Sequence, residues 1–165
     1  MRKIQDKFIF IVVTILLSTA CQPKLPQGWR FPTNEELKHT WRNESNNRYA
    51  LLEEDFNDDG IIDKAALLMR DDGTGLGLFV FFGQAVVKLD EVNDSKLIEC
   101  IGIRNINYGP YKTVCGKGYI NCAEDEPSEI IIASKTIDYF KIEGANSFFY
   151  LDIASNYFKR IWISD

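Results

Sequence analysis

From residue 48 to residue 164 the chain alternates apolar runs of strand length with turn-forming segments. β-branched and aromatic side chains are frequent in most of these runs, as they are in strands with a buried face. Many links contain Gly, Asn or Asp, which tolerate tight turns, and short links favour antiparallel neighbours. The runs cover residues 48–54, 64–70, 76–82, 85–91, 96–103, 129–134, 147–153 and 157–164. We therefore predict an α+β fold that is mainly an antiparallel β sheet, of meander or sandwich-like form.

Some segments in this region are less clear than the others. The run 64–70 is the least strand-like because it holds two alanines, and 136–143 fits either a strand or a single helical turn. Residues 108–112 fit a plain turn or an aromatic and basic recognition edge. The final run, 157–164, is predicted to be a last strand pinned by Trp162.

One short N-terminal helix is predicted ahead of the strands. Thr33 and Glu36 have the spacing of a capping box, in which each side chain bonds the other residue's backbone amide. Leu37 and Trp41 are four residues apart and would share one face of a helix that runs to about Arg42. The polar segment that follows would end it.

The first 20 residues have the organisation of a secretory signal peptide. A basic start is followed by an apolar core at residues 8–17 and by small residues at 18–20. This core is well short of the roughly 20 residues that a membrane-spanning helix needs. The sequence therefore predicts an exported protein with a signal peptide at residues 1–20.

Residues 17–21, Leu-Ser-Thr-Ala-Cys, resemble the bacterial lipobox, in which cleavage precedes a cysteine that carries the lipid. The most common form of that motif has Leu at the place that Ser18 takes here. The resemblance implies a lipoprotein in the cell envelope, held on the membrane by lipid on Cys21. In a cell with two membranes, Gln22 in place of the Asp associated with inner-membrane retention implies the outer membrane, facing the periplasm. The alternative is an ordinary secretory signal followed by a chance cysteine.

The rest of the chain divides into a tether and a domain. Residues 21–32 contain three prolines and are expected to form an extended, lipidated tether. Trp29 and Phe31 would dock its far end onto the core. Residues 33–165 have the length of one ordinary domain, and we expect a single β-rich globular domain there.

The charge of the chain argues against one class of partner. It carries 19 basic and 24 acidic side chains, a net charge of −5. Three of the basic residues and one of the acidic residues belong to the predicted signal peptide, so its removal enlarges the acidic excess. Nucleic acid, which requires a basic surface, is therefore not an expected partner.

Three cysteines follow the predicted lipid site. Cys115 and Cys122 enclose a short loop with two glycines, and in an oxidising compartment we expect this closest pair to form a disulfide. Cys100 is then the odd thiol, which its apolar neighbours place in a buried strand. Other pairings among the three stay open from sequence alone. A zinc site is disfavoured because the chain has one histidine, His39, and no paired C-x-x-C spacing.

The segment Asp-Phe-Asn-Asp-Asp-Gly-Ile-Ile-Asp at residues 55–63 is the one motif with a specific chemical interpretation. It resembles the calcium loop of EF-hand and dockerin-type sequences, D-x-[DN]-x-[DN]-G. Calcium takes six to eight oxygen ligands, and such loops supply them at alternate positions. The resemblance implies ligation by the side chains of Asp55, Asn57, Asp59 and Asp63 and by the backbone carbonyl of Ile61.

The neighbouring residues refine this interpretation. Gly60 would allow the sharp turn, and Ile62 would point into the core and fasten the loop. Ala66 stands where an EF-hand supplies a bidentate glutamate, so the resemblance is to the shorter D-x-D-x-D-G-x-x-D loops that connect strands. A missing ligand would come from the acidic residues at 53–54 or 71–72. A calcium ion there would be structural rather than catalytic, and the alternative is a solvated hairpin turn.

Two classes of function fit these features. The first is an envelope-anchored, non-catalytic binding or inhibitor module with an envelope protein as partner and a structural Ca²⁺ loop. It is favoured because the chain is acidic and rich in aromatic residues and has no recognisable nucleophile motif. The second is an envelope hydrolase that depends on calcium in the acidic loop or on His39 as a general base.

Overall fold

The computed structural model describes residues 24–119, 122–123, 126–152 and 154–164. The predicted signal peptide (1–20), Cys21 and Gln22 lie outside the described residues. Within the described part, antiparallel β strands dominate, so the prediction of a mainly antiparallel β fold is confirmed. The strands are β1 (Trp29–Arg30), β2 (Leu51–Glu54), β3 (Asp63–Arg70), β4 (Leu76–Phe82), β5 (Ala85–Val92), β6 (Ile101–Asn105), β7 (Gly109–Lys112), β8 (Glu129–Ile132), β9 (Thr136–Lys141), β10 (Asn146–Asp152) and β11 (Tyr157–Ser164).

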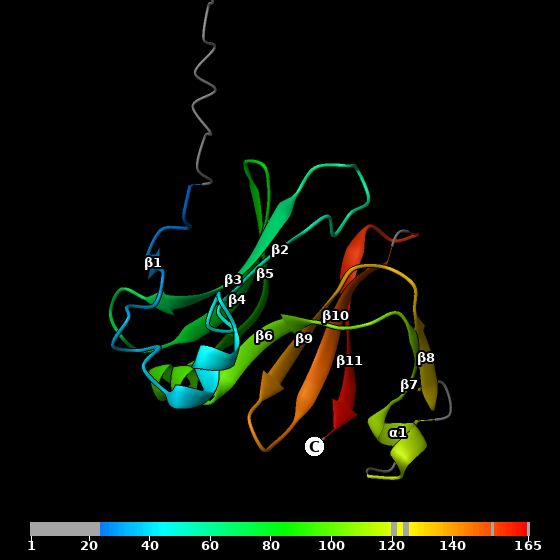
Figure 1. Cartoon of the computed structure of the whole chain (residues 1–165). Coiled ribbons are helices and arrows are strands. Elements are labelled where there is room, and N and C mark those ends of the chain that lie inside the picture. The colour runs from blue at the N-terminus through cyan, green and yellow to red at the C-terminus, as the bar shows by residue number, and fades with distance from the viewer. Residues whose placement is uncertain (1–23, 120–121, 124–125, 153, 165) are drawn as a thin grey trace, which may run out of the picture.

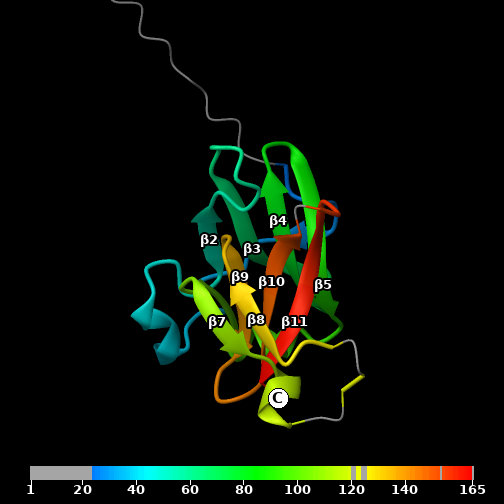
Figure 2. The same ribbon diagram turned by 90° about the vertical axis from the view of Figure 1, so that its right-hand side faces the viewer.

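The described strands form three sheets. The first has the order β1-β3-β4-β5, with β2 also paired to β3, the second has the order β11-β10-β9-β6, and β7 pairs with β8 alone. The two larger sheets share one hydrophobic core, to which Leu67 and Val80 contribute from the first sheet and Ile103, Ile137 and Phe149 from the second. Figures 1 and 2 show the small β7–β8 sheet and α1 (Val114–Lys117) beside the second sheet, at the end where the chain finishes.

The run that looked least strand-like, 64–70, belongs to a strand that is buried on both faces. Ala65 and Leu67 of β3 pack into the core between the two sheets. Ala66 and Leu68 point to the other face, where Trp29 of β1 covers them. A strand covered on both sides has no polar face, and alanine fits where large rings such as Trp29 pack above the sheet.

The predicted N-terminal helix is wrong. The capping box forms, since the Thr33 amide donates to Glu36 Oε2 at 2.7 Å and the Glu36 amide donates to Thr33 Oγ1 at 3.3 Å. However, the chain makes only one turn, becomes extended at His39, and continues as the 3₁₀ helix η1 (Thr40–Glu44). The α-helix in the described residues is α1, much later in the chain.

Tertiary contacts explain why the helix stops. Trp41 Nε1 donates to the Glu99 carbonyl at 3.1 Å. The Arg42 side chain is fully buried and donates to the Arg48 carbonyl at 2.6 Å, to the Ile101 carbonyl at 2.5 Å and to the Ile98 carbonyl. The bonds to Glu99, Ile98 and Ile101 hold η1 against a segment more than fifty residues away in the sequence.

The run 96–103 is a strand only in its second half. Asp94 caps the 3₁₀ helix η2 (Ser95–Glu99) by accepting from the Lys96 amide, and β6 starts at Ile101. Cys100 is therefore not a buried strand cysteine but the partly exposed residue that ends η2, and it is a free thiol. The ambiguous segment 136–143 contains a strand, β9.

The segment 108–112, considered as a turn or a recognition edge, contains strand β7. The tether segment also contains a strand, because β1 pairs with the end of β3. Trp29 is buried as expected, whereas Phe31 is half exposed. Within the described residues, no helix has the length and apolar character needed to cross a bilayer.

Candidate functional site

The acidic loop connects β2 to β3, and the pairing of Glu54 with Asp63 closes the hairpin at its base. Its first carboxylate organises the turn. Asp55 Oδ1 accepts from the Asp59 amide at 3.1 Å and Asp55 Oδ2 accepts from the Gly60 amide at 2.8 Å. Gly60 has φ of +83°, a left-handed conformation that glycine adopts without strain, as its place in the motif predicts.

The side chains of Asn57 and Asp59 support the same turn. Asn57 Oδ1 accepts from the Asp59 amide at 3.1 Å, and Asn57 Nδ2 donates to Asp59 Oδ2 at 2.9 Å. Asp59 Oδ1 accepts from the Ile61 amide at 2.8 Å. The three side chains proposed as ligands from sequence thus already face one loop and bond its backbone amides. Such side-chain-to-backbone bonds fix the conformation of a turn without any core packing.

Asp63 differs from the other acidic residues because it is buried, with 2 % of its surface exposed. Its Oδ2 accepts from the Phe56 amide at 3.1 Å. Burial raises the pKa of the Asp63 carboxyl, and the negative charges of Asp59 and Asp55 raise it further. A bound cation would remove this repulsion.

The loop is fastened to the core by a different residue from the one expected. Ile62 is 62 % exposed, whereas Phe56 is buried. The reason is the alternation of side chains along a strand. β3 begins at Asp63 with its side chain pointing inward, so the preceding Ile62 must point outward. Ile61 is also exposed, at 63 %.

The donor atoms of the loop fit a calcium ion by type but are not gathered as closely as a bound ion requires. Carboxylate, amide and carbonyl oxygens are the ligands that calcium prefers. In the described part of the chain, Asp55, Asp59 and Asp63 do not form a group of three whose oxygens all lie within 4.8 Å of one another. Binding would require these carboxylates to move closer together than they lie here.

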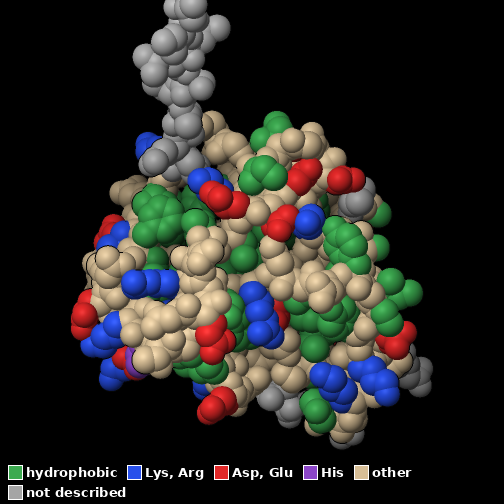
Figure 3. Space-filling view, in the orientation of Figure 1, with side chains coloured by type: hydrophobic (Ala, Val, Ile, Leu, Met, Phe, Trp, Pro, Cys, Tyr) green, Lys and Arg blue, Asp and Glu red, His purple; other side chains and the backbone are tan. Residues whose placement is uncertain are grey.

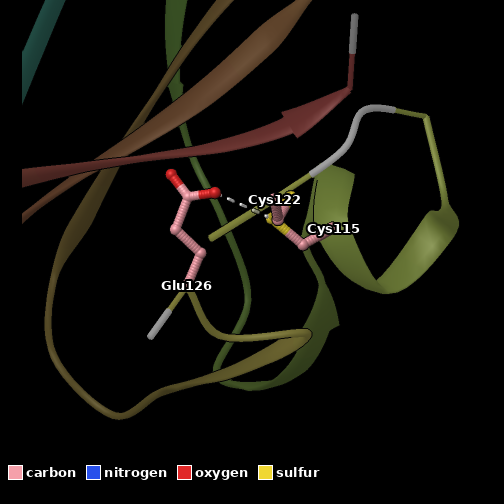
Figure 4. A group of neighbouring side chains, drawn as sticks. All are labelled: Cys115, Cys122 and Glu126. Atoms are coloured by element: carbon pink, nitrogen blue, oxygen red, sulfur yellow. Dashed lines mark hydrogen bonds between the residues drawn. A yellow bond between two sulfur atoms is a disulfide. The ribbon is translucent and has the colours of Figure 1, made fainter. Parts of the chain in front are cut away.

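Cys115 and Cys122 form the disulfide expected from their spacing, with their Cα atoms 5.7 Å apart. Glu126 Oε2 lies 3.6 Å from Cys115 Sγ, and these three residues are the one His/Cys/Asp/Glu group compact enough for a metal among the described residues (Figure 4). Because metals bind the thiolate form of cysteine, two sulfurs joined to each other do not make a metal site. The group is a structural link between α1 and the segment before β8.

A second surface lies around Trp162 on β11, an edge strand of the second sheet. Trp162 does not pin the strand, since it is 44 % exposed while its neighbour Ile163 is buried. The Arg160 guanidinium stacks on the indole ring, 4.0 Å from its centroid. Arg160 is itself held by an ion pair with Asp90 of β5 at 3.2 Å and by a bond to Ser147 Oγ at 2.9 Å.

Two cavities meet at this stacked pair. One, of about 340 Å³, opens between the sheets and is lined by Val92, Leu97, Tyr139, Arg160 and Trp162 among others. The other, of about 310 Å³, lies toward α1 and shares Arg160 and Trp162 with the first. Sequence reasoning missed this surface, although the Ile161-Trp162-Ile163 alternation signals that the indole points away from its apolar neighbours.

His39 lies on the surface at the start of η1. Its Nε2 is 3.8 Å from Glu99 Oε2, and both line a cavity of about 230 Å³ together with Ser95. The two residues come from segments that lie far apart in the sequence. Comparisons of the chain with protein-family models, with curated proteins and with solved structures found no match.

Proposed function

We propose that this protein is an envelope lipoprotein, anchored through lipid on Cys21, whose sandwich-like β domain is a non-catalytic module that binds another envelope protein. In a cell with two membranes it would sit on the outer membrane and face the periplasm. The anchor is supported by the sequence of residues 1–21. The binding role is supported by the surface around Trp162, which lies toward the end of β11, away from the side where the N-terminal segment leaves the domain (Figure 1).

The observation that carries the binding role is the stacked pair of Arg160 and Trp162 between two cavities. Trp and Arg are the residue types that most often dominate binding energy when a partner covers them. Here the ion pair with Asp90 and the bond to Ser147 hold Arg160 in place against the indole. The Trp162 side chain therefore loses little conformational entropy when a partner binds. The exposed edge of β11 also offers backbone groups to a partner strand.

We propose further that the β2–β3 loop binds Ca²⁺ through Asp55, Asn57, Asp59, the Ile61 carbonyl and Asp63. What supports this is the raised pKa of Asp63 beside two further carboxylates, a repulsion that a cation relieves. The role would be to rigidify the loop, since calcium bound by the folded chain alone stabilises it.

The binding role is tested with a photo-crosslinking amino acid placed at Trp162 in the full-length protein in cells. Phe31, which is 50 % exposed and follows β1 of the first sheet, is the matched control position. We expect one envelope protein to be crosslinked in stoichiometric amount from position 162 and not from position 31. Identical adducts from both positions, or none from 162, would contradict the proposal.

The pair of His39 and Glu99 supports the second candidate function, a hydrolase of an envelope substrate with His39 as general base. A carboxylate beside a histidine can orient the ring, and Ser95 in the same cavity is a candidate nucleophile. This function predicts turnover of cell-wall or lipid substrates that disappears in His39→Ala while the fold survives. A matched Lys112→Ala variant, at an exposed position on β7, should retain it.

A further inference from the structure

Two adjacent isoleucines stand exposed in the β2–β3 loop. Ile61 is 63 % exposed and Ile62 is 62 % exposed. The hydrogen bond from the Ile61 amide to Asp59 and the inward side chain of Asp63 fix the backbone on both sides of them. The pair is therefore presented by an ordered turn, on the side of the loop that leads into β3. Adjacent exposed apolar side chains in such a loop are typical of an interaction site.

Other apolar side chains lie close to this loop. Val87, near the β4–β5 turn, is 39 % exposed, and Tyr157, after the β10–β11 turn, is 75 % exposed. Together with Asn57 of the acidic loop they line one cavity of about 370 Å³. Three chain turns thus gather at one end of the molecule. Figure 3 shows hydrophobic side chains at this upper edge, beside acidic ones.

The N-terminal segment leaves the domain at the same end. Leu25 packs against the cluster on the outer face of the first sheet, to which Leu51 of β2 and Val86 of β5 also belong. Figures 1 and 2 agree that the segment before β1 starts on the side of the β2–β3 loop and the β4–β5 turn.

The distance between the anchor and the domain is therefore short. Leu25, which is already in contact with the domain, follows Cys21 by only four residues. Four residues span at most roughly 14 Å even when fully extended. Lipid on Cys21 would hold this end of the domain within that distance of the membrane surface, which is too little for the domain to turn its opposite end toward the bilayer.

From this juxtaposition we infer that the end of the domain formed by the β2–β3 loop, the β4–β5 turn and the β10–β11 turn rests on the bilayer that holds Cys21, with Ile61 and Ile62 inserted at its interface. The inference rests on the proposed lipid anchor and adds an orientation and a contact surface to it. Isoleucine side chains gain free energy at the boundary of headgroups and acyl chains. Trp162, near the C-terminal end of β11, then faces away from the membrane, where a protein partner can reach it.

The acidic residues of the loop make the contact sensitive to membrane charge. Asp58 and Asp59 lie three and two residues before Ile61, so an anionic surface would repel this end of the domain. A bilayer of phosphatidylcholine has no net charge and is the appropriate first membrane for a test.

The test uses the full-length protein, processed and lipidated in cells, with Cys100→Ser to remove the free thiol. Ile62→Cys and, separately, Ile131→Cys are labelled with an environment-sensitive fluorophore, and the protein is reconstituted into phosphatidylcholine nanodiscs. Ile131, 73 % exposed on β8 in the small sheet next to α1, is the matched control. We expect the emission of the probe at position 62 to shift to shorter wavelength and to be quenched by lipids that carry a quencher. The probe at position 131 should show neither change.

The mass of the N-terminal peptide separates the two ways in which this can fail. If Cys21 carries acyl chains and the probe at position 62 behaves like the one at position 131, the inferred contact is wrong and the anchor stands. If Cys21 carries no lipid, the proposed lipid anchor is wrong, and the inferred membrane contact, which rests on it, is wrong as well. A shift at both positions would also overturn the inferred orientation.

Discussion

The backbone amide of Phe56 donates a hydrogen bond to Oδ2 of Asp63, 3.1 Å away, across the base of the β2–β3 loop. Both residues are buried. The acidic loop is thus fixed to the core at its two ends, and the turn between them is held by hydrogen bonds that the side chains of Asp55, Asn57 and Asp59 accept. The loop joins the buried carboxylate of Asp63 to exposed ones. Calcium bound in the loop should therefore change the free energy of unfolding of the whole domain.

Calcium should stabilise the mature chain. At a concentration 100 times the Kd, the free energy of unfolding should rise by about 2.7 kcal/mol if calcium binds the folded chain and not the unfolded one. The variant Asp55→Ala/Asp59→Ala should lose this increase. Asp71→Ala/Asp72→Ala should keep it, because the β3–β4 turn lies at the opposite end of β3 from the acidic loop and so does not supply the missing ligand. Thermal unfolding of metal-stripped protein with and without calcium measures the effect. Wild-type protein that does not respond to calcium would reduce the loop to an acidic hairpin turn.

Replacement of Arg42 by alanine should destabilise the domain by about 3 kcal/mol or more. The change removes a buried guanidinium from three backbone carbonyls and leaves them without a donor. Burial lowers the pKa of Arg42 to about 10, so the group stays charged at neutral pH. Urea unfolding measures the loss. Lys96→Ala, an exposed cation on η2, serves as the control, and equal midpoints for the two variants would show that Arg42 is not a structural link.

Removal of the disulfide should cost somewhat less than about 3 kcal/mol, the entropic value for a loop this short. The variant Cys115→Ser/Cys122→Ser is compared with Cys100→Ser, which removes a free thiol that is not buried. The midpoint of urea unfolding should fall in the first and stay unchanged in the second. A larger fall of the midpoint in Cys100→Ser would show that Cys100, and not the disulfide, stabilises the domain.

The pair of Arg30 and Glu36 should make stability depend on pH. The hydrogen bond from Arg30, which outweighs the opposing effect of burial, lowers the pKa of Glu36 to about 2 from its ordinary 4.5. Because the folded pKa is depressed, the stability that Glu36 contributes is present above pH 4.5 and is lost as the pH falls toward 2. An ion pair this exposed is worth up to about 1 kcal/mol.

The difference in unfolding free energy between wild type and Glu36→Gln, measured in urea at pH 6 and at pH 3, tests this dependence. We expect it to shrink at the lower pH. Glu35→Gln, at an exposed neighbouring position, is the control. A Glu36→Gln difference that is independent of pH would mean that the carboxylate charge does not contribute.

Several features followed from sequence because they depend on near neighbours. The strands from Leu76 to Phe82 and from Tyr157 to Ser164 have the bounds predicted from their apolar runs. The disulfide between Cys115 and Cys122 follows from a short spacing that any compact loop would close. The capping box at Thr33 also forms as its spacing predicts. In each case, interactions between residues close in the sequence are enough to form the feature, so it can be predicted without knowing the tertiary contacts.

Other features depended on which segments meet, and sequence could not supply that. Whether the turn at Thr33 continues as a helix is decided by the carbonyls of Ile98 and Ile101, which lie more than fifty residues from Arg42. The exposure of Ile62 depends on where β3 begins, because a shift of one residue along a strand exchanges its two faces. The surface around Trp162 exists because Asp90, from a different sheet, holds Arg160 over the indole. The sequence by itself determined the strands, the disulfide and the acidic motif, whereas the tertiary structure decided which side chains face the core and which face a partner, because each of those choices rests on contacts between distant segments.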